Sequence, residues 1–262
     1  MRAPPNAHVS SIKLSDQVTR ALARRIANGE FGDGVQPPTE LEICQEFGVS
    51  KTTAREVIRS LAERGFVEVR QGRRMQVRDA AAWNQLDPLM IELIDDPVVA
   101  RRYLADVHYV RTLIEPEVAA RAALSADADQ IGRARDSVEL MAGLEDDPDA
   151  YLEADVAFHR ELAAATESVI LAFVLDSLAE LQRLSRRVTN RLLHRMPEAT
   201  REHRRILEAV AARKPERARR AMQAHLKTVA HVWVPGEQDA EFEALFTNAG
   251  RMERRRGTWS MS

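Results

Sequence analysis

Cysteine is almost absent from the sequence, which has only Cys44 among 262 residues. A single cysteine excludes an internal disulfide and a zinc site built from several thiolates. Long apolar runs are also missing: no stretch of about 18 apolar residues occurs, so we expect no transmembrane helix. The N-terminal segment lacks the apolar core of a secretory signal peptide. These absences predict a protein of the reducing cytoplasm.

Charge of either sign is not in excess overall, but it is unevenly distributed. The formal net charge is −2. Residues 1–78 contain 13 Lys and Arg against 9 Asp and Glu, whereas residues 79–262 contain 25 against 31. A basic N-terminal part on an acidic body indicates an anionic partner for the N-terminal part. The chain length allows one to two domains.

Local patterns near the N-terminus predict three helices followed by a hairpin. Apolar residues recur every four positions in residues 14–26, as on one face of an amphipathic helix. Thr39 with Glu42 fits a capping box that begins a second helix, and Ser50 is a suitable N-cap for a third. Two short alternating segments then flank Gly72, which is typical of a half-buried β-hairpin. This order is that of a winged helix-turn-helix domain.

The third predicted helix begins with the side chains that a DNA-recognition helix needs. Such a helix places its N-terminal residues against base edges in the major groove, where Arg and Lys donate to guanine. Arginines of the hairpin suit the minor groove or the phosphate backbone. The predicted DNA contacts are Ser50, Lys51, Thr52, Thr53, Arg55, Arg70, Gly72, Arg73 and Arg74. One basic helix alone is also typical of a solvated face, but the ordered combination of elements favours DNA binding.

The rest of the chain predicts an all-α bundle. Long stretches rich in Ala, Leu, Glu and Arg have helical periodicity and are broken at proline- and aspartate-containing points. We expect about six helices, plus one from the segment that precedes them. Two of the expected inner faces are marked by Val107, Val110, Leu113, Ile114 and Val118, and by Phe173, Val174, Leu178, Leu181 and Leu184.

The predicted elements give a mainly α protein with two domains and three flanking or linking segments. The expected divisions are a disordered arm (1–10), the winged helix-turn-helix domain (11–79), a linker (80–97), the helical domain (98–235) and a C-terminal tail (236–262). The linker contains Trp83, Leu86, Leu89 and Ile91, so we expect it to pack on one or both domains. A short helix is expected in the tail at 241–246.

One aspartate and three histidines in the helical domain can form a metal site. Asp155 and His159 are four residues apart, so they share one face of a helix. His203 and His225 belong to two further predicted helices, and a bundle core can bring all four side chains together. Imidazole and carboxylate ligands suit Zn²⁺, Ni²⁺, Mn²⁺ or Fe²⁺. A single histidine is more often a surface or core residue, and four are placed in that class: His8, His108, His194 and His231.

Residues 12–78 resemble the DNA-binding domain of the GntR family of bacterial transcription regulators. The similarity is carried by "TELEICQEFGVSKTTAREVIRSLAERGFVEVRQGRRMQV". It implies that Lys51, Thr53, Arg55 and Gly72 contact DNA. Leu41 stands where the family often has an arginine, a departure that concerns the operator sequence recognised rather than DNA binding itself.

Residues from about 98 to 230 resemble the FCD domain of the FadR subgroup of this family. The segments "VRTLIEPEVAARAAL", "EADVAFHRELAAAT", "EHRRILEAV" and "ARRAMQAHL" carry the similarity. Many members bind a metal through an aspartate and three histidines, so the resemblance implies that role for Asp155, His159, His203 and His225. It also implies that Arg111 grips the carboxylate of an effector. The segment "WNQLDP" is similar to regulators of sugar-acid catabolism, which favours a sugar acid such as an aldonate.

These observations predict a homodimeric, ligand-responsive transcription regulator, with repression as the favoured sign. Its expected partners are double-stranded operator DNA, a divalent metal ion and a small carboxylate, without a membrane. Two alternatives remain open: a metal-sensing regulator in which the ion itself is the signal, and a metal-dependent enzyme whose ion activates water. No general base is evident beside the predicted ligands, and an enzyme leaves the DNA-binding part unexplained. We therefore predict no catalytic residue.

Overall fold

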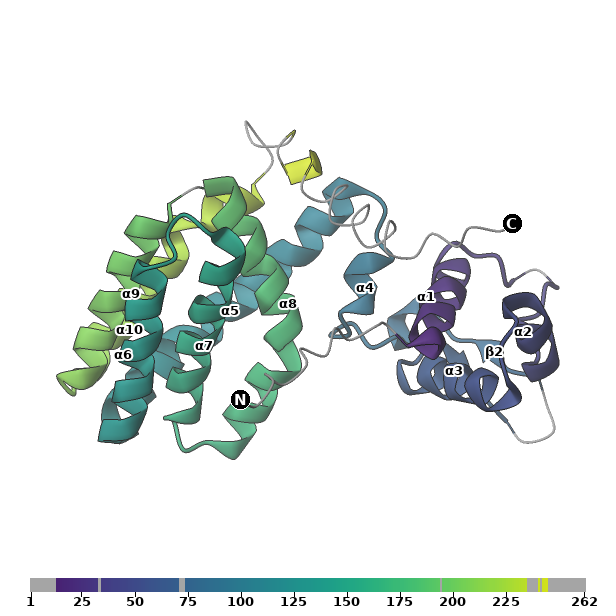
Figure 1. Ribbon diagram of the computed structural model, residues 1–262, viewed down its shortest axis with the longest axis horizontal. Helices are drawn as coiled ribbons and strands as arrows, with labels where there is room; N and C mark the ends of the chain where they lie inside the picture. Colours follow the sequence, from purple (N-terminus) through teal and green to yellow (C-terminus); the bar gives the residue numbers. More distant parts are fainter. Residues whose placement is uncertain are drawn as a thin grey trace, which may run out of the picture. The chain divides into compact units, whose positions relative to one another are not determined.

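The computed structural model describes residues 13–32, 34–70, 74–193, 195–234, 240 and 242–244. These residues form two compact units, one up to Leu93 and one from Ile94 onward, and both are drawn in Figure 1. Ten α-helices but only two short strands occur in the described residues. The expectation of a mainly α fold is confirmed. Within the same residues, no helix has the length and apolar character needed to cross a membrane.

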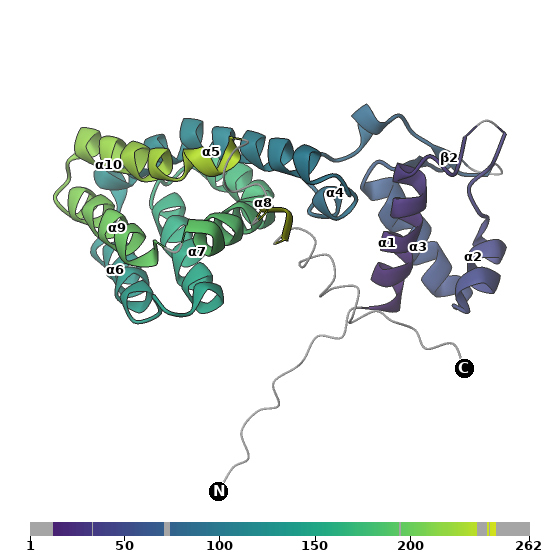
Figure 2. The ribbon, with the colours of Figure 1, turned by 90° about the horizontal axis from the view of Figure 1, so that it is seen from above.

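The first unit consists of three helices and a two-stranded antiparallel sheet. Its elements are α1 (Leu14–Ala27), α2 (Glu40–Phe47), α3 (Lys51–Glu63), β1 (Val67–Glu68) and β2 (Gln76–Val77). The helices enclose a core in which Leu22, Ile43, Leu61 and Phe66 are fully buried. α1 and α3 lie side by side in this unit (Figure 2). The core therefore fixes the orientation of α3, the predicted recognition helix.

Side-chain caps begin the second and third helices as the sequence predicted. The Thr39 hydroxyl accepts from the backbone N–H of Glu42, and the Glu42 carboxylate accepts from the backbone N–H of Thr39. Ser50 Oγ accepts from the backbone N–H of Thr53 at 3.2 Å. These bonds satisfy donors that have no partner within the helices, so the start of α3 is set by local sequence.

Gly65 connects α3 to β1 in a backbone conformation that excludes other residues. Its φ is +82°, and a Cβ added there would lie 2.5 Å from the carbonyl oxygen of Ala82. Glycine alone combines a left-handed conformation with such a close backbone approach. The turn brings the segment after β2 against the end of α3.

The segment expected to be a linker packs on the first unit. It contains a 3₁₀ turn (Ala80–Ala82) and the short helix α4 (Leu89–Glu92). The Trp83 ring lies 4.9 Å from the ring of Phe66, centroid to centroid, and Leu89 belongs to the core of the first unit. The residues between β2 and Leu93 are therefore held by apolar contacts.

The second unit is a bundle of six α-helices in the described residues, the number that the sequence predicted. They are α5 (Pro97–Ser125), α6 (Ala128–Ala142), α7 (Pro148–Ala164), α8 (Val169–Leu193), α9 (Met196–Ala211) and α10 (Pro215–Thr228), followed by a 3₁₀ turn (Ala230–Trp233). α10 runs beside α5 and α9, and α6 runs beside α7 (Figure 2). Proline stands in the first turn of α5, α7, α9 and α10, where its missing N–H costs no helical hydrogen bond.

Two of the inner faces that the sequence predicted are partly wrong. Leu178 and Leu181 of α8 are buried as expected, but Phe173 and Val174 of the same helix are 70% and 37% exposed. On α5, Leu113 is 60% exposed instead of buried. Helical spacing alone does not separate a stripe that faces the core from a second apolar stripe that faces solvent. These exposed apolar side chains therefore lie outside the core of the bundle.

The ends of the chain fall largely outside the described residues, and so do the expected arm (1–10) and most of the tail (236–262). Within the tail, residues 240 and 242–244 are helical, and 242–244 fall inside the region 241–246 where a short helix was expected. Phe242 is buried, and the guanidinium carbon of Arg101 lies 4.4 Å from the centre of its ring. This contact ties that part of the tail to the beginning of α5.

Candidate metal centre and DNA-binding surface

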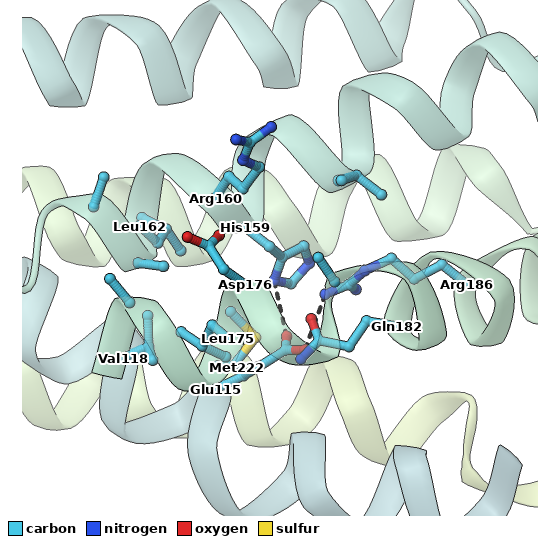
Figure 3. A pocket seen from close by; sticks show the side chains of 15 residues that line it. Glu115, Val118, His159, Arg160, Leu162, Leu175, Asp176, Gln182, Arg186 and Met222 are labelled. Atoms are coloured by element: carbon cyan, nitrogen blue, oxygen red, sulfur yellow. Dashed lines mark hydrogen bonds and ion pairs between the residues drawn. The ribbon is translucent and has the colours of Figure 1, made fainter. Parts of the chain in front are cut away.

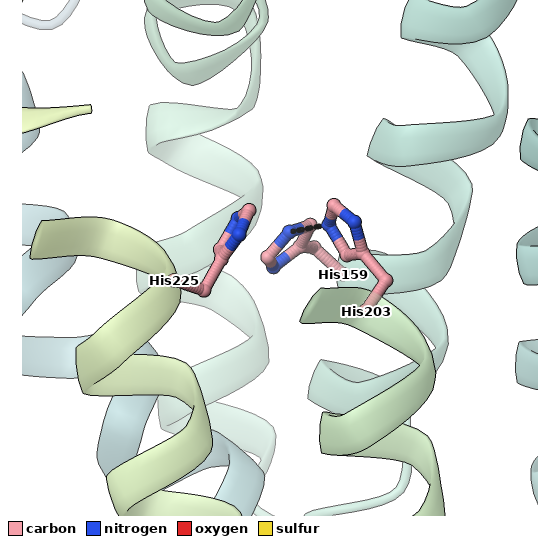
Figure 4. Close-up of side chains that lie close together, drawn as sticks. All are labelled: His159, His203 and His225. Atoms are coloured by element: carbon pink, nitrogen blue, oxygen red, sulfur yellow. Dashed lines mark hydrogen bonds between the residues drawn. The ribbon is translucent and has the colours of Figure 1, made fainter. Parts of the chain in front are cut away.

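Three helices of the second unit bring three histidines to one point in the core (Figure 4). His159 from α7, His203 from α9 and His225 from α10 each offer one ligand atom, and the three atoms lie within 4.8 Å of one another. Asp155, one turn before His159, places Oδ1 3.0 Å from His203 Nε2 and 3.5 Å from His159 Nε2. All four side chains are buried. The structure thus brings together the four residues that the sequence predicted as metal ligands.

Each of the three histidines has an oxygen acceptor at its Nδ1 atom. The pairs are His159 Nδ1 with Glu115 Oε2 at 2.8 Å, His203 Nδ1 with the carbonyl oxygen of Ala199 at 2.7 Å, and His225 Nδ1 with Glu202 Oε2 at 2.9 Å. A neutral imidazole carries its proton on one nitrogen and a lone pair on the other. The acceptors place the proton on Nδ1, so every Nε2 has a lone pair available for a metal.

Burial favours the neutral form of two histidines of this centre, His203 and His225. Desolvation, aided by the neighbouring histidines, lowers the pKa of His225 to about 3. Desolvation also lowers the pKa of His203 and outweighs the attraction of Asp155. For Asp155 itself, burial would raise the pKa, but opposing influences led by the positive charge of Arg186 hold it well below its ordinary value. The centre therefore combines the neutral imidazoles of His203 and His225 with an ionised carboxylate.

The separations within this centre fit one divalent ion. The Nε2 atoms of His159 and His203 are 3.2 Å apart, and two facing lone pairs repel unless a cation or proton lies between them. Asp155 Oδ1 is buried and has no hydrogen-bond donor among the described residues. Two ligand atoms at about 2.0–2.2 Å from one ion lie roughly 3–3.5 Å from each other. The donor set suits Zn²⁺, Ni²⁺, Mn²⁺ or Fe²⁺, the ions named from the sequence.

A buried network of ion pairs adjoins the centre. Glu115 Oε1 accepts from Arg111 Nε at 2.8 Å and from Arg186 Nη2 at 2.9 Å. Arg186 Nε lies 3.8 Å from Asp155 Oδ2, so the network reaches a predicted ligand. Arg111, the predicted effector residue, is therefore buried and paired with Glu115.

Sequence reasoning missed three charged residues that support the centre: Glu115, Arg186 and Glu202. Glu115 had a local signal, because it follows Arg111 by four residues on one helix face. Arg186 and Glu202 reach their partners from other helices, so no spacing in the sequence relates Arg186 to Asp155 or Glu202 to His225. Only the packing of α8 and α9 places them there.

Two cavities flank this network. The smaller, about 20 Å³, lies beside the ligands and is lined by Arg111, Asp155, Arg186, Thr189, Asn190, Arg195, Met196, Ala199, His203, His225 and Val229. The larger, about 180 Å³, lies between α5, α7, α8 and α10 (Figure 3). Glu115, His159 and Gln182 line the larger cavity, and Arg186 lines both. Arg186 is therefore shared by the linings of both cavities.

The first turns of α3 are exposed, as a recognition helix requires. Ser50 caps the helix, Lys51 and Thr52 are exposed, and Thr53 is half-buried. Arg55 donates from Nε to Glu40 Oε2 at 2.8 Å, and 71% of its side chain remains exposed. The N-terminal end of α3 therefore presents a hydroxyl, an ammonium and a guanidinium group on its accessible side.

Two of the predicted hairpin contacts are ion-paired. Arg70 Nε lies 3.0 Å from Glu68 Oε1, and Arg74 Nη2 lies 3.1 Å from Glu42 Oε1. Both pairs are exposed, and exposed pairs contribute only about 0.2–1 kcal/mol. A phosphate can therefore replace either carboxylate at little cost. The remaining predicted contacts, Gly72 and Arg73, lie outside the described residues.

Comparisons with known proteins match both parts of the chain. Residues 14–77 match "Bacterial regulatory proteins, gntR family", and residues 106–228 match the FCD domain. The chain is 31% identical over 223 residues to the HTH-type transcriptional repressor NanR of Klebsiella aerogenes, covering 84% of this chain and 85% of that protein. It is 26% identical over 201 residues to the galactonate operon transcriptional repressor of Escherichia coli K12, covering 76% and 88%.

A solved structure shares the fold at low sequence identity. It is that of Lar, which controls the expression of the Listeria monocytogenes agr system, with a TM-score of 0.59, 16% identity, and coverage of 86% of this chain and 98% of that chain. Both of the relatives named above are transcriptional repressors, so the comparisons favour a transcription regulator over the enzyme alternative. The chain belongs to the gntR family of bacterial regulatory proteins and carries an FCD domain.

Proposed function

We propose that this protein is a homodimeric repressor of the FadR subgroup that binds operator DNA and responds to a small carboxylic acid at a metal-containing centre. The observation that carries the proposal is the convergence of Asp155, His159, His203 and His225, with all three Nδ1 atoms held by acceptors. Acceptors hold the side chains of this centre in place, and the same chain has an exposed recognition helix. The protein is therefore suited to couple ligand binding to DNA binding.

The DNA-binding part of the proposal rests on α3. Its exposed N-terminal turn combines Lys51, Thr52 and Arg55 with the partial positive charge of a helix N-terminus, which attracts phosphate. Arg55 is held by Glu40 through an exposed ion pair, so little free energy is lost when DNA takes the place of the carboxylate. We assign base or phosphate contacts to these side chains and to Arg70 and Arg74.

The effector part rests on the smaller cavity. When bound, a divalent ion supplies coordination positions that accept an oxygen of the effector. Asn190 lines the same cavity, and its Nδ2 has no acceptor within the described part of the chain. A hydroxylated carboxylic acid offers oxygen acceptors for Asn190 and Arg111. One relative is the galactonate operon repressor; galactonate is a sugar acid, which supports an aldonate as effector.

A second candidate is a regulator for which the metal itself is the signal. The cavity beside the ligands measures about 20 Å³, which is room for about one water molecule. A single ion fits this space without rearrangement, whereas an aldonate requires the surrounding helices to separate. The size of the cavity is the observation that favours this candidate.

The homodimer rests on exposed apolar side chains of α5 and α8. Val169, Ile170 and Phe173 of α8 are 82%, 74% and 70% exposed, and Tyr109 and Leu113 of α5 are 61% and 60% exposed. The two helices pack against each other within the second unit. Exposed apolar surface of this kind marks an interaction site, and two-fold dimers are the commonest assemblies. We assign this surface to a second copy of the chain.

Fluorescence anisotropy with DNA from upstream of the gene that encodes this chain tests the proposal. We expect specific binding that weakens steeply with salt, as phosphate contacts require, and weaker binding to an unrelated duplex. Galactonate that releases the DNA only when metal is present supports the first candidate. Release or tightening by metal alone supports the second. Equal affinity for both duplexes contradicts the assignment of α3.

A further inference from the structure

The larger cavity has the size and lining of a binding site that the proposed regulator does not use. Its volume is about 180 Å³, and an apolar cavity of about 150 Å³ is enough to hold benzene. Apolar side chains from four helices form most of its wall, among them Val118, Leu162, Leu175 and Met222. A small apolar body therefore fits between α5, α7, α8 and α10 (Figure 3).

Two buried donors stand at the polar side of this cavity. Gln182 is 9% exposed and Arg186 is 2% exposed. Gln182 Nε2 and Arg186 Nη1 have no hydrogen-bond acceptor among the residues that the structure describes. Both side chains line the cavity, and Figure 3 shows the Gln182 amide beside Arg186 and Glu115. An unpaired buried donor costs about 1–3 kcal/mol, so an acceptor oxygen at this place is stabilising.

The Glu115 carboxylate at the same place lies close to donors of the protein itself. Glu115 Oε1 accepts from Arg111 and Arg186, and Glu115 Oε2 lies 2.8 Å from His159 Nδ1. At the outer side, Arg160 and Asp176 are exposed and carry opposite charges, so the entrance gives no preference for either sign. The two unpaired donors of the inner side therefore favour a ligand with an acceptor oxygen.

We propose that this cavity binds a small molecule with an apolar body about the size of a benzene ring and one carbonyl or carboxylate group, whose oxygen accepts from Gln182 and Arg186. The site goes beyond the proposed function. Of the four predicted metal ligands, only His159 belongs to its lining, and Asp155, His203 and His225 do not. It also differs from the smaller cavity in being mostly apolar.

Isothermal titration calorimetry of the full-length protein with benzoate, benzamide and toluene tests this site. We expect benzoate or benzamide to bind with 1:1 stoichiometry and a Kd of about 1 mM or below, in metal-free and metal-loaded protein alike. Preference between the two distinguishes a carboxylate ligand from a neutral carbonyl ligand. Toluene leaves both donors unpaired, so it should bind at least about tenfold more weakly.

Variants of α8 locate the binding. Ala179→Leu fills the cavity and should abolish binding, whereas Gln182→Leu should weaken benzoate or benzamide about tenfold and leave toluene unchanged. Glu180→Gln, at an exposed position of the same helix, is the matched control and should bind as the original chain does. Circular dichroism checks folding, and Ala172→Leu on the same wall replaces Ala179→Leu if that variant does not fold.

Three results would overturn the proposed site. The first is no heat of binding at 10 mM ligand, which is roughly ten times the expected Kd. The second is binding that Ala179→Leu or Ala172→Leu leaves unchanged, and the third is binding that disappears with a chelator and in His203→Ala. The last result would move the ligand to the metal centre. Metal content and operator affinity of the same variants are measured separately, so a failure of the proposed repressor function is distinguishable from a failure of this site.

Discussion

His225 donates from Nδ1 to Glu202 Oε2 at 2.9 Å, across the contact between α10 and α9. Burial by itself would raise the pKa of Glu202, but hydrogen bonds from His225 and Arg195 outweigh it and lower the pKa to about 2. Glu202 is therefore an ionised acceptor that fixes both the tautomer and the orientation of His225. Such outer partners of metal-binding histidines contribute strongly to metal affinity.

Glu202→Ala should lower metal affinity by about 10–100-fold, because His225 loses the acceptor that holds Nε2 toward the centre. Competition of the purified protein with a chromophoric chelator measures the change for Zn²⁺ and Ni²⁺. Glu198→Ala, one turn earlier on α9 and exposed in a pair with Arg201, is the control and should retain the original affinity. Equal metal affinity in Glu202→Ala would remove His225 from the ligand set.

Arg55→Ala should weaken operator binding by about 10–100-fold, because one base or phosphate contact of a recognition helix is worth roughly 1–3 kcal/mol. Anisotropy at fixed salt measures the change, and circular dichroism confirms that α3 persists. Arg217→Ala removes a similarly exposed arginine from α10 and should not change affinity. Operator affinity unchanged in Arg55→Ala would contradict the assignment of α3 as the recognition helix.

The candidate metal site shows how far local sequence patterns reach. The spacing of Asp155 and His159 placed them on one helix face, and the structure confirms that placement. The convergence with His203 and His225 depends on how three helices pack, which the sequence indicated only through the family resemblance. Glu202 was missed because the contact that matters joins two different helices, and no periodicity relates them.

In the fold, too, features that depend on neighbouring residues were predicted correctly, whereas features that depend on distant helices were not. Thr39, Glu42 and Ser50 were predicted as helix caps because capping depends on neighbours within three residues. Phe173 and Leu113 were assigned to inner faces and are exposed, because each helix has apolar residues on more than one face. Which stripe enters the core depends on helices distant in the sequence.

His108 gives the protein a stability that depends on pH. It is 5% exposed, its ring lies 5.9 Å from that of Trp233, and neither ring nitrogen has a partner in the described residues. Burial, then the charge of Arg111, lower its pKa to about 4; Glu115 opposes this and Arg186 adds to it. The unfolded pKa is about 6.5. The unfolded chain therefore binds a proton first, and stability present above about pH 6.5 is lost as the pH falls toward 4.

Between pH 7.5 and pH 5 the share of this loss that His108 causes should amount to about 2 kcal/mol of unfolding free energy, in addition to the shares of His203 and His225, whose pKa values are also lowered. Urea unfolding of metal-free protein at the two pH values, in the original chain and in His108→Leu, measures this share. His108→Leu should reduce the difference by about that amount, whereas His231→Gln, at an exposed position, should leave it unchanged. The same pH difference in His108→Leu and in the original chain would show that other groups cause it.

The apolar surface of α8 gives the last prediction. Phe173→Glu should convert the dimer to a monomer, because a carboxylate placed in an apolar interface loses its hydration without gaining a partner. Sedimentation velocity at several protein concentrations measures the dissociation constant, which should rise at least about tenfold, as a cost of roughly 1.4 kcal/mol or more implies. Leu140→Glu on α6 introduces the same charge at a side chain that is 55% exposed, and it should leave the dimer intact. If the variant dissociates, its operator affinity should also fall, since each half-site then binds a single head. A Phe173→Glu variant that sediments as the original dimer would instead move the interface to another face of the bundle.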